Sequence, residues 1–388
     1  MRESINVIYE EPSYWQRLRP VFTGFDAPLT LAIGLLAAIG LLTMYSAGFD
    51  HGARFSGHAR NMLLGLLVLF AVAQVSPHRL MALAVPLYAL GVALLIATAM
   101  WGITKKGATR WLNVGPIIQP SEVLKIAVPL VLAWWYQRRE GQVRASDHLV
   151  ALALLALPVG LIVKQPDLGT AILVLSAGLY VIFFAGLSWG LVVPVIGIIV
   201  LGAAALVITE GQICQPEVKW PLLREYQKNR VCTLLDPSTD PLGKGFHILQ
   251  GMIAIGSGGV SGKGFMKGTQ THLEFIPERT TDFIFAAFAE EFGLIGCAAL
   301  LLGFTFLIIR GLMIAVEAPT MFTRLLAGGI TLSFFTYAFV NMGMVSGVLP
   351  VVGIPLPFVS YGGTAMVSLG LGLGILMSIA KSRRLVQS

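Results

Sequence analysis

The chain has 388 residues and a net charge of +7, and only 12% of its residues are charged, whereas 56% belong to the apolar set AVILMFWYC. Its mean hydropathy is +0.78. A soluble surface carries charge at about twice that frequency, and so apolar a chain cannot remain disordered. The composition therefore predicts an integral membrane protein. The positive charge is explained by cytoplasmic Lys and Arg, so it does not indicate a nucleic-acid partner.

Ten apolar runs are long enough, or nearly long enough, to cross a bilayer, which takes about 20 residues. They are Ala27–Ser46, Asn61–Val75, Leu80–Trp101, Ser121–Tyr136, Leu149–Val163, Thr170–Leu187, Gly190–Thr209, Phe283–Ile309, Leu325–Leu349 and Gly363–Ala380. Because the runs are continuous rather than alternating, a β-barrel is disfavoured. We predict an all-α polytopic membrane protein with ten transmembrane helices in a single domain, residues 1–388.

The distribution of Lys and Arg between the loops predicts the orientation, because cytoplasmic loops carry the excess. With the N-terminus inside, twelve such residues are internal: Arg2, Arg17, Arg19, Arg79, Arg138, Arg139, Arg144, Arg310, Arg324, Lys381, Arg383 and Arg384. Six lie in short outer loops: Arg54, Arg60, Lys105, Lys106, Arg110 and Lys164. Both termini are therefore predicted to be cytoplasmic.

The long loop 210–282, between the seventh and eighth spans, is then external. Apolar spacing over Phe246–Ile255 predicts a helix on the membrane surface. The stretch Gly256–Gly268 fails the pattern of a phosphate-binding Walker loop, and a flexible surface loop is favoured. Cys214 and Cys232 would face an oxidising compartment and could form a disulfide, although two independent thiols are equally compatible with the spacing.

The first ionisable cluster is Gln119–Lys125, where a span begins. Ser121 is a plausible N-cap, and Glu122 stands in the first turn, where the helix dipole favours an anion. Lys125 lies three residues further and shares a face with Glu122. A Lys inside a span needs an interior partner, so a functional pair is favoured over a capping acid with its ion pair.

The preceding outer loop is basic and aromatic. Lys105, Lys106, Arg110 and Trp111 suit an anionic head group there. The alternative is an interfacial Trp with solvated cations.

Asp167 lies between the fifth and sixth spans, in Gln165–Thr170. It is a candidate binding residue, and it is equally well explained as the N-cap of the next helix.

The third cluster lies where the long loop re-enters the membrane. Asp282 directly precedes an apolar run, and partial desolvation there suits a general base. Arg279, three residues earlier, could hold it ionised or contact substrate. The local pattern by itself favours the alternative, an N-cap with an ion pair at the start of the helix. Glu290 and Glu291 lie two turns deeper, so at least one must face a cavity or a partner.

Five motifs together resemble the SEDS family (shape, elongation, division and sporulation), and most closely its rod-shape branch. They are Gly107–Trp111, Gln119–Glu122, Gln165–Thr170, Pro277–Asp282 and Pro357–Gly363. Each motif is weak alone, but five in this order within ten spans are specific. Many members carry an Arg in the segment before Gln119; this chain is one residue shorter there and lacks it.

The resemblance implies a peptidoglycan glycosyltransferase of the bacterial inner membrane that polymerises lipid II during lateral elongation, with its active site on the periplasmic face. Its partners would be a class B penicillin-binding protein, elongation-complex membrane proteins and membrane lipid. The family's essential acid falls on Asp282, and its Glu and Lys fall on Glu122 and Lys125. Ser360 and Tyr361, in the last motif, are candidate substrate-binding residues.

Glycosyl transfer from a lipid diphosphate needs one base, assigned to Asp282, and positive charge for the leaving diphosphate. Lys125 and Arg110 are expected to supply that charge, and Glu122 is expected to orient Lys125 or to bind a cation. Mg²⁺ or another divalent cation could also take part, but the sequence predicts no protein site for a metal ion. Two alternatives remain. A lipid II flippase needs polar groups through the full membrane depth, whereas a non-catalytic elongation scaffold tolerates neutral changes at Asp282.

Overall fold

The computed structural model describes residues 24–50, 52–105, 108–113, 115, 117–215, 217–218, 220, 225–239, 243–276 and 278–387. Its long helices are α2 (Ala27–Ala47), α3 (Gly52–Ala73), α4 (Pro77–Trp101), α5 (Pro120–Gln137), α6 (Ala145–Lys164), α7 (Leu168–Phe184), α8 (Trp189–Ile208), α13 (Ile284–Val316), α14 (Met321–Val345) and α15 (Gly363–Gln387). Between α8 and α13 lie α9 (Glu210–Ile213), α10 (Glu225–Leu235), the 3-10 helix Pro237–Thr239, α11 (Lys244–Gly258) and α12 (Thr269–His272).

Each of the ten predicted apolar runs coincides with one long helix. Among the described residues, eight helices are long and apolar enough to cross a membrane. The other two are α7, an apolar helix of 17 residues, and α5, which carries Glu122 and Lys125. The prediction of a helical, polytopic membrane protein is confirmed. Several boundaries were wrong. Helix α3 begins at Gly52 instead of Asn61, so Arg54 and Arg60 lie in a helix rather than in a loop. Helix α13 ends at Val316 instead of Ile309 and so includes Arg310, and α15 ends at Gln387 instead of Ala380.

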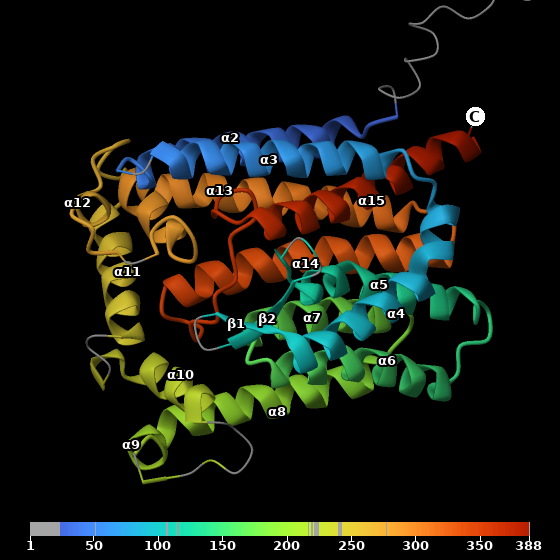
Figure 1. Cartoon of the computed structure of the whole chain (residues 1–388), viewed down its shortest axis with the longest axis horizontal. Coiled ribbons are helices and arrows are strands. Elements are labelled where there is room, and N and C mark those ends of the chain that lie inside the picture. The colour runs from blue at the N-terminus through green and yellow to red at the C-terminus, as the bar shows by residue number, and fades with distance from the viewer. Residues whose placement is uncertain are drawn as a thin grey trace, which may run out of the picture.

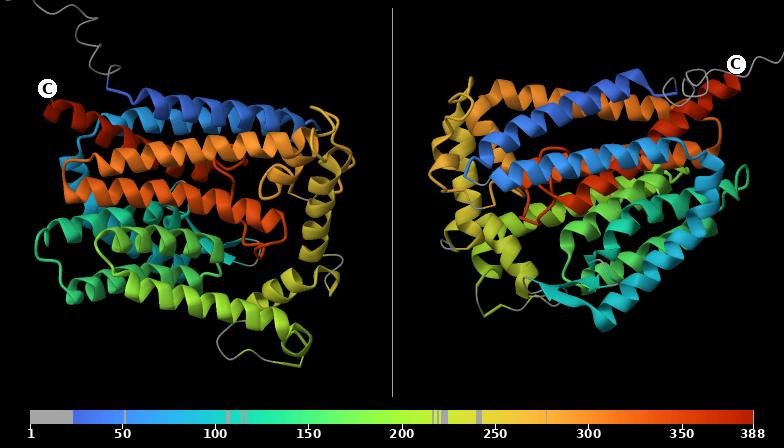
Figure 2. Two further views of the ribbon diagram at one scale, coloured as in Figure 1. Left: turned by 180° about the vertical axis from the view of Figure 1, so that it is seen from behind. Right: turned by 45° about the horizontal axis from the view of Figure 1, so that its top comes forward.

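The long helices run side by side along the longest axis of the molecule (Figure 1). Helix α11 crosses one end of this bundle, opposite the end at which the C-terminus lies, and Figure 2 shows the same arrangement from behind. The helix predicted over Phe246–Ile255 is therefore confirmed as α11. The start of α13, which follows Asp282, lies at this end of the bundle, beside α11 (Figure 1).

Three short strands connect α4 to α5, where the sequence predicted a loop. They are β1 (Ile103–Lys105), β2 (Ala108–Asn113) and β3 (Ile117–Ile118), antiparallel and in the order β1-β2-β3. In β2 the side chains of Ala108 and Leu112 are buried, whereas Arg110 between them is partly exposed. This burial pattern lacks the two-residue alternation of a half-buried strand, so the strand could not be recognised within a polar, aromatic segment.

The glycine-rich stretch after α11 is held against a kink in α13 rather than being a free loop. At the kink Gly293 has φ 62° and ψ −161°, outside helical values. The backbone of residues 259–264 replaces the hydrogen bonds that the helix loses: Lys263 N donates to Glu290 O, Gly264 N to Glu291 O, Leu294 N to Gly259 O and Ile295 N to Val260 O, at 3.0 to 3.1 Å. Backbone pairing on both sides of the break thus joins the end of the long loop to α13.

The two deep glutamates both have partners, as their burial required. The carboxylate of Glu290 is fully buried and accepts hydrogen bonds from Lys263 Nζ (2.7 Å), Gln270 N (2.8 Å), Thr271 N (3.1 Å) and Thr271 Oγ1 (2.9 Å). Glu291 accepts a hydrogen bond from the Ser46 hydroxyl at the end of α2. The prediction that at least one faces a partner is confirmed, and both carboxylates fasten α13 to its neighbours.

Gly262→Ala is expected to destabilise the protein. Gly262 has φ +76°, and an added Cβ would lie 2.1 Å from the carbonyl oxygen of Glu291. The backbone conformation alone costs roughly 1–2 kcal/mol for a residue with a side chain, and the clash adds to that. Thermal unfolding in detergent should show a lower midpoint. Gly256→Ala is the matched control, because an added Cβ there meets nothing within 4 Å; equal midpoints for both variants would contradict the docking of this loop.

Cys214 and Cys232, which are 18 positions apart in sequence, form a disulfide with their Cα atoms 5.6 Å apart. It joins the residue that follows α9 to α10, within the long loop. Cys297, in α13, is a free and half-buried thiol.

Alkylation without reductant is expected to modify one thiol per chain, because only Cys297 is free when Cys214 and Cys232 are bridged. Intact mass after denaturation of protein taken directly from the membrane measures this number. After reduction, three thiols should react. Three alkylated thiols before reduction would refute the bridge and weaken the external placement of the loop.

Candidate functional site

Glu122 and Lys125 form a buried ion pair at the start of α5. Lys125 Nζ lies 2.7 Å from Glu122 Oε1, and the two side chains are 8% and 14% exposed. The second oxygen of Glu122 accepts a hydrogen bond of 2.8 Å from Ser368 Oγ on α15. The predicted pairing is confirmed, and both carboxylate oxygens are engaged by protein groups.

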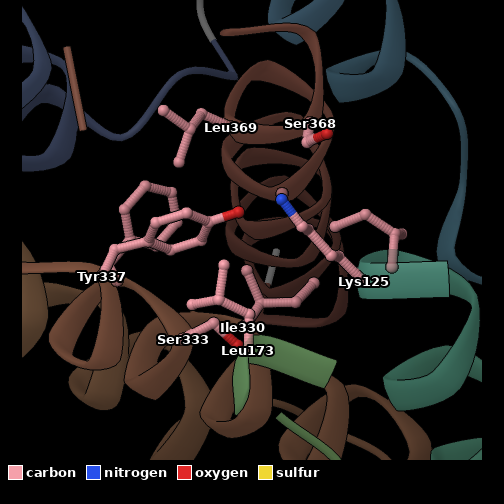
Figure 3. A pocket seen from close by; sticks show the side chains of 10 residues that line it. Lys125, Leu173, Ile330, Ser333, Tyr337, Ser368 and Leu369 are labelled. Atoms are coloured by element: carbon pink, nitrogen blue, oxygen red, sulfur yellow. The ribbon is translucent and has the colours of Figure 1, made fainter. Parts of the chain in front are cut away.

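A small cavity of about 30 Å³ lies beside the ammonium group of Lys125, lined also by Leu173, Ile330, Tyr337, Ser368 and Leu369. That volume holds a water molecule, not a diphosphate. The Tyr337 hydroxyl and the Lys125 ammonium point toward one another (Figure 3), and Lys125 Nζ lies 5.4 Å from the ring centroid. Tyr337 and Ser368 could not be predicted as site residues, because a neutral polar residue in an apolar run gives no distinctive signal.

Arg110, in β2, and Asp167, directly before α7, lie close together although they are far apart in sequence. Arg110 Nη1 lies 3.6 Å from Asp167 Oδ1, and their side chains are 32% and 6% exposed. Gln119 Nε2 donates to Asp167 Oδ2 at 2.9 Å. Asp167 is also the N-cap of α7 and accepts from Thr170 N at 3.2 Å. The N-cap explanation for Asp167 is confirmed, and the carboxylate also contacts Arg110; its role in binding substrate stays a prediction.

The other basic and aromatic residues of that connection are only partly described. Trp111 lies in β2, where it pairs with Ile103 of β1. Lys105 ends β1, and its side chain lies outside the described part of the structure, as does all of Lys106.

Asp282 is half-buried in the turn that precedes α13. The segment before it is held by the loop 346–362, which follows α14. Ser360 Oγ donates to Thr281 O at 2.7 Å, and Tyr361 N donates to Thr280 O at 2.8 Å. Ser360 is 2% exposed. These predicted substrate-binding residues thus lie beside Asp282, and the Ser360 hydroxyl is used within the protein.

Two residues that the sequence analysis did not select contact Asp282 directly. Asn341 Nδ2, on α14, donates to the main-chain oxygen of Asp282 at 3.0 Å. Gly353 faces the carboxylate, because a Cβ built on it would lie 3.2 Å from Asp282 Oδ2. The carboxyl group therefore lies against bare backbone, where a side chain would crowd it.

Arg279 is anchored to the end of α2. Its guanidinium lies 2.5 Å from Asp50 Oδ2 and 3.4 Å from Glu274 Oε1. Its Nε donates to Ala47 O at 3.0 Å. These contacts fix the end of the long loop to α2. The sequence analysis instead expected Arg279 to act on Asp282 or on substrate, because it lies three residues before Asp282.

The fold and the site define a polytopic helical membrane protein whose buried and half-buried ionisable groups gather where α5, α7 and α13 begin. The chain belongs to the FtsW, RodA and SpoVE family of cell cycle proteins, which it matches over residues 26–385. The resemblance inferred from the five motifs is thereby confirmed.

Relatives and solved structures agree with this assignment over nearly the whole chain. The chain is 44% identical, over 96% of its own length and 97% of the relative's, to the peptidoglycan glycosyltransferase MrdB of Escherichia coli. It resembles the crystal structure of the rod shape determining protein RodA of Thermus thermophilus, with a TM-score of 0.68, 27% identity and coverage of 93% and 98%. It also resembles a chain in a peptidoglycan synthase complex that coordinates polymerization and crosslinking, with a TM-score of 0.75, 31% identity and coverage of 92% and 98%.

Proposed function

We propose that this protein is a peptidoglycan glycosyltransferase that polymerises lipid II into glycan strands during lateral cell-wall elongation. The observation that carries the proposal is the 44% identity, over nearly all of both chains, with a relative of that named activity. The half-buried Asp282, held between α14 and the loop 346–362, supports it as a group that could act in the transfer.

The reaction joins the 4-hydroxyl of an acceptor GlcNAc to the anomeric carbon of a donor MurNAc. The new bond is the glycosidic C–O bond, and the bond that breaks joins the anomeric carbon to the lipid diphosphate. An α-linked donor and a β-linked product imply inversion by direct displacement. The Asp282 carboxylate takes the hydroxyl proton as general base, and diphosphate leaves without an obligatory general acid.

Positive charge stabilises the departing diphosphate. Arg110 is 32% exposed and contacts Asp167, so its guanidinium group is accessible to a substrate diphosphate. Lys125 is 8% exposed beside a cavity of water size, so the helices around that cavity must separate before it makes direct contact. Glu122 orients Lys125.

We propose no site for a divalent cation on the described side chains. No group of three or more His, Cys, Asp or Glu side chains among them could hold a metal ion, and both oxygens of Glu122 are engaged by Lys125 and Ser368. We therefore assign no step of the reaction to a protein-bound cation; Mg²⁺ carried by the substrate diphosphate stays a proposal.

The proposed topology places ten spans in the bacterial inner membrane, both termini in the cytoplasm and residues 210–282 in the periplasm, with the active site on that side. The excess of Lys and Arg in the predicted inner loops supports it. The likeness to a chain of a peptidoglycan synthase complex supports a class B penicillin-binding protein as partner, beside other elongation-complex membrane proteins and membrane lipid.

Labelled lipid II tests the activity. Purified protein, with and without its cognate penicillin-binding protein, should produce glycan polymer. A flippase would instead move labelled lipid II across vesicle membranes without forming polymer, and a scaffold would do neither. Absence of polymer in the presence of the partner would overturn the proposal.

A further inference from the structure

We propose that Asn341 is a positioning residue for the reaction: its side-chain amide holds the Asp282 backbone and the opposing wall of the site at a fixed separation. The inference rests on the proposed function, because it takes Asp282 as the general base.

The amide of Asn341 joins two segments that are far apart in sequence. Its side chain is fully buried in α14. Nδ2 donates to Asp282 O at 3.0 Å and to Ile354 O at 2.7 Å. Both hydrogens of one NH₂ group are thus used on two main-chain carbonyls, one at the entrance to α13 and one in the loop that follows α14.

The second of these contacts determines what the Asp282 carboxylate faces. Ile354 directly follows Gly353, which lies against Asp282 Oδ2. Gly353 has φ +76°, a backbone conformation that favours glycine. By holding Asp282 and Ile354 at once, Asn341 sets the gap between the carboxylate and the backbone of Gly353. Misplacing a reacting group by about 1 Å costs about 10²-fold in rate.

Helix α14 also contacts the second ionisable centre. Tyr337, which faces Lys125 (Figure 3), precedes Asn341 by four residues. Residues four apart lie on one helix face, about 6 Å apart along the axis. Side chains of one helix, α14, thus contact both the proposed base Asp282 and the buried cation Lys125. A rigid element that holds both groups keeps their relative positions fixed.

One atom of Asn341 distinguishes this role from simple packing. Its Oδ1 is buried and has no hydrogen-bond partner among the described residues. Leaving a buried acceptor unpaired costs about 1–3 kcal/mol. An apolar residue of similar size would remove that cost, which partly offsets the cost of leaving the main-chain oxygens of Asp282 and Ile354 without these donors. Stability and rate are therefore expected to respond differently to its substitution.

Asn341→Leu separates the two responses. It should lower kcat for glycan polymerisation per folded molecule about 10²-fold, whereas KM for lipid II changes by less than about threefold and the thermal midpoint in detergent falls only modestly. Thr331→Val is the matched control: Thr331 lies on the same helix, is fully buried and has an unpartnered Oγ1, and its variant should keep the native kcat. If the leucine variant does not fold, Asn341→Ala removes both donors without adding bulk and should show the same loss per folded molecule.

A double variant tests whether Asn341 acts through Asp282. In the Asp282→Asn background, Asn341→Leu should change the residual rate less than about threefold, because there is no base left to position. Two independent losses that multiply would overturn the inference, as would a native kcat in Asn341→Leu or Asn341→Ala. If Asp282→Asn itself keeps the native rate, it is the assignment of the base that fails, and the two failures are thereby distinguished.

Discussion

Asp282→Asn is expected to reduce glycan polymerisation by about 10²–10⁴-fold, the usual contribution of a general base, without loss of folded protein. The amide keeps the shape of the carboxyl group but cannot accept the hydroxyl proton. The hydrogen bond from Asn341 goes to the main-chain oxygen of Asp282, so it survives the substitution. Gel analysis of polymer from labelled lipid II measures the rate, and thermal unfolding checks the fold.

Glu278→Gln provides the matched control for this prediction. Glu278 is an exposed acid in the same short segment, four residues before Asp282, and neutralising it removes the same charge near the membrane surface. Its variant should polymerise lipid II at nearly the native rate. A near-native rate in Asp282→Asn would instead show that Asp282 is not the base, and it would agree with the scaffold interpretation.

The helical architecture could be predicted because each span buries a continuous apolar run. Prediction was least accurate where a helix begins with polar residues. Helix α3 starts at Gly52 and includes Arg54, which hydropathy assigns to a loop, yet Arg54 Nη1 donates to Thr280 Oγ1 at 2.6 Å. The kink at Gly293 was not predicted either. Backbone hydrogen bonds with residues 259–264 stabilise it, and a pattern of side chains does not reveal backbone hydrogen bonds of this kind.

The candidate site was predictable where charge or local spacing marked it. Glu122 and Lys125 are three apart on one helix, so their contact follows from geometry. Arg110 and Asp167 were selected separately, but only the fold brings them together. Asn341 and Gly353 gave no signal at all: one is a neutral amide within an apolar helix and the other is one glycine among 43. Their significance comes from what they contact.

Lys125→Met is expected to lower the polymerisation rate of the folded protein by about 10²–10³-fold, the usual effect of removing one stabilising group from a developing charge. The methionine keeps the length of the side chain but strands the Glu122 carboxylate, which is 14% exposed. Breaking a buried ion pair costs about 3–5 kcal/mol, although the hydrogen bond from Ser368 limits the loss. Rates must therefore be measured per folded molecule, with thermal unfolding in parallel.

The double change Glu122→Gln with Lys125→Met separates a functional lysine from a structural one. It removes the stranded charge, so the thermal midpoint should recover, whereas the rate should stay low if the ammonium group serves the reaction. The equivalent control is Asp26→Asn with Arg310→Met. This ion pair is also buried: the two groups lie 2.6 Å apart, and Asp26 and Arg310 are 3% and 18% exposed. It lies where α2 begins, at the opposite end of that helix from the contact with Arg279, and so away from the candidate site. The control should keep the native rate. Because a merely structural pair at α5 would regain rate and stability together, recovery of polymerisation in the Glu122→Gln, Lys125→Met protein would exclude a role for Lys125 in the chemistry.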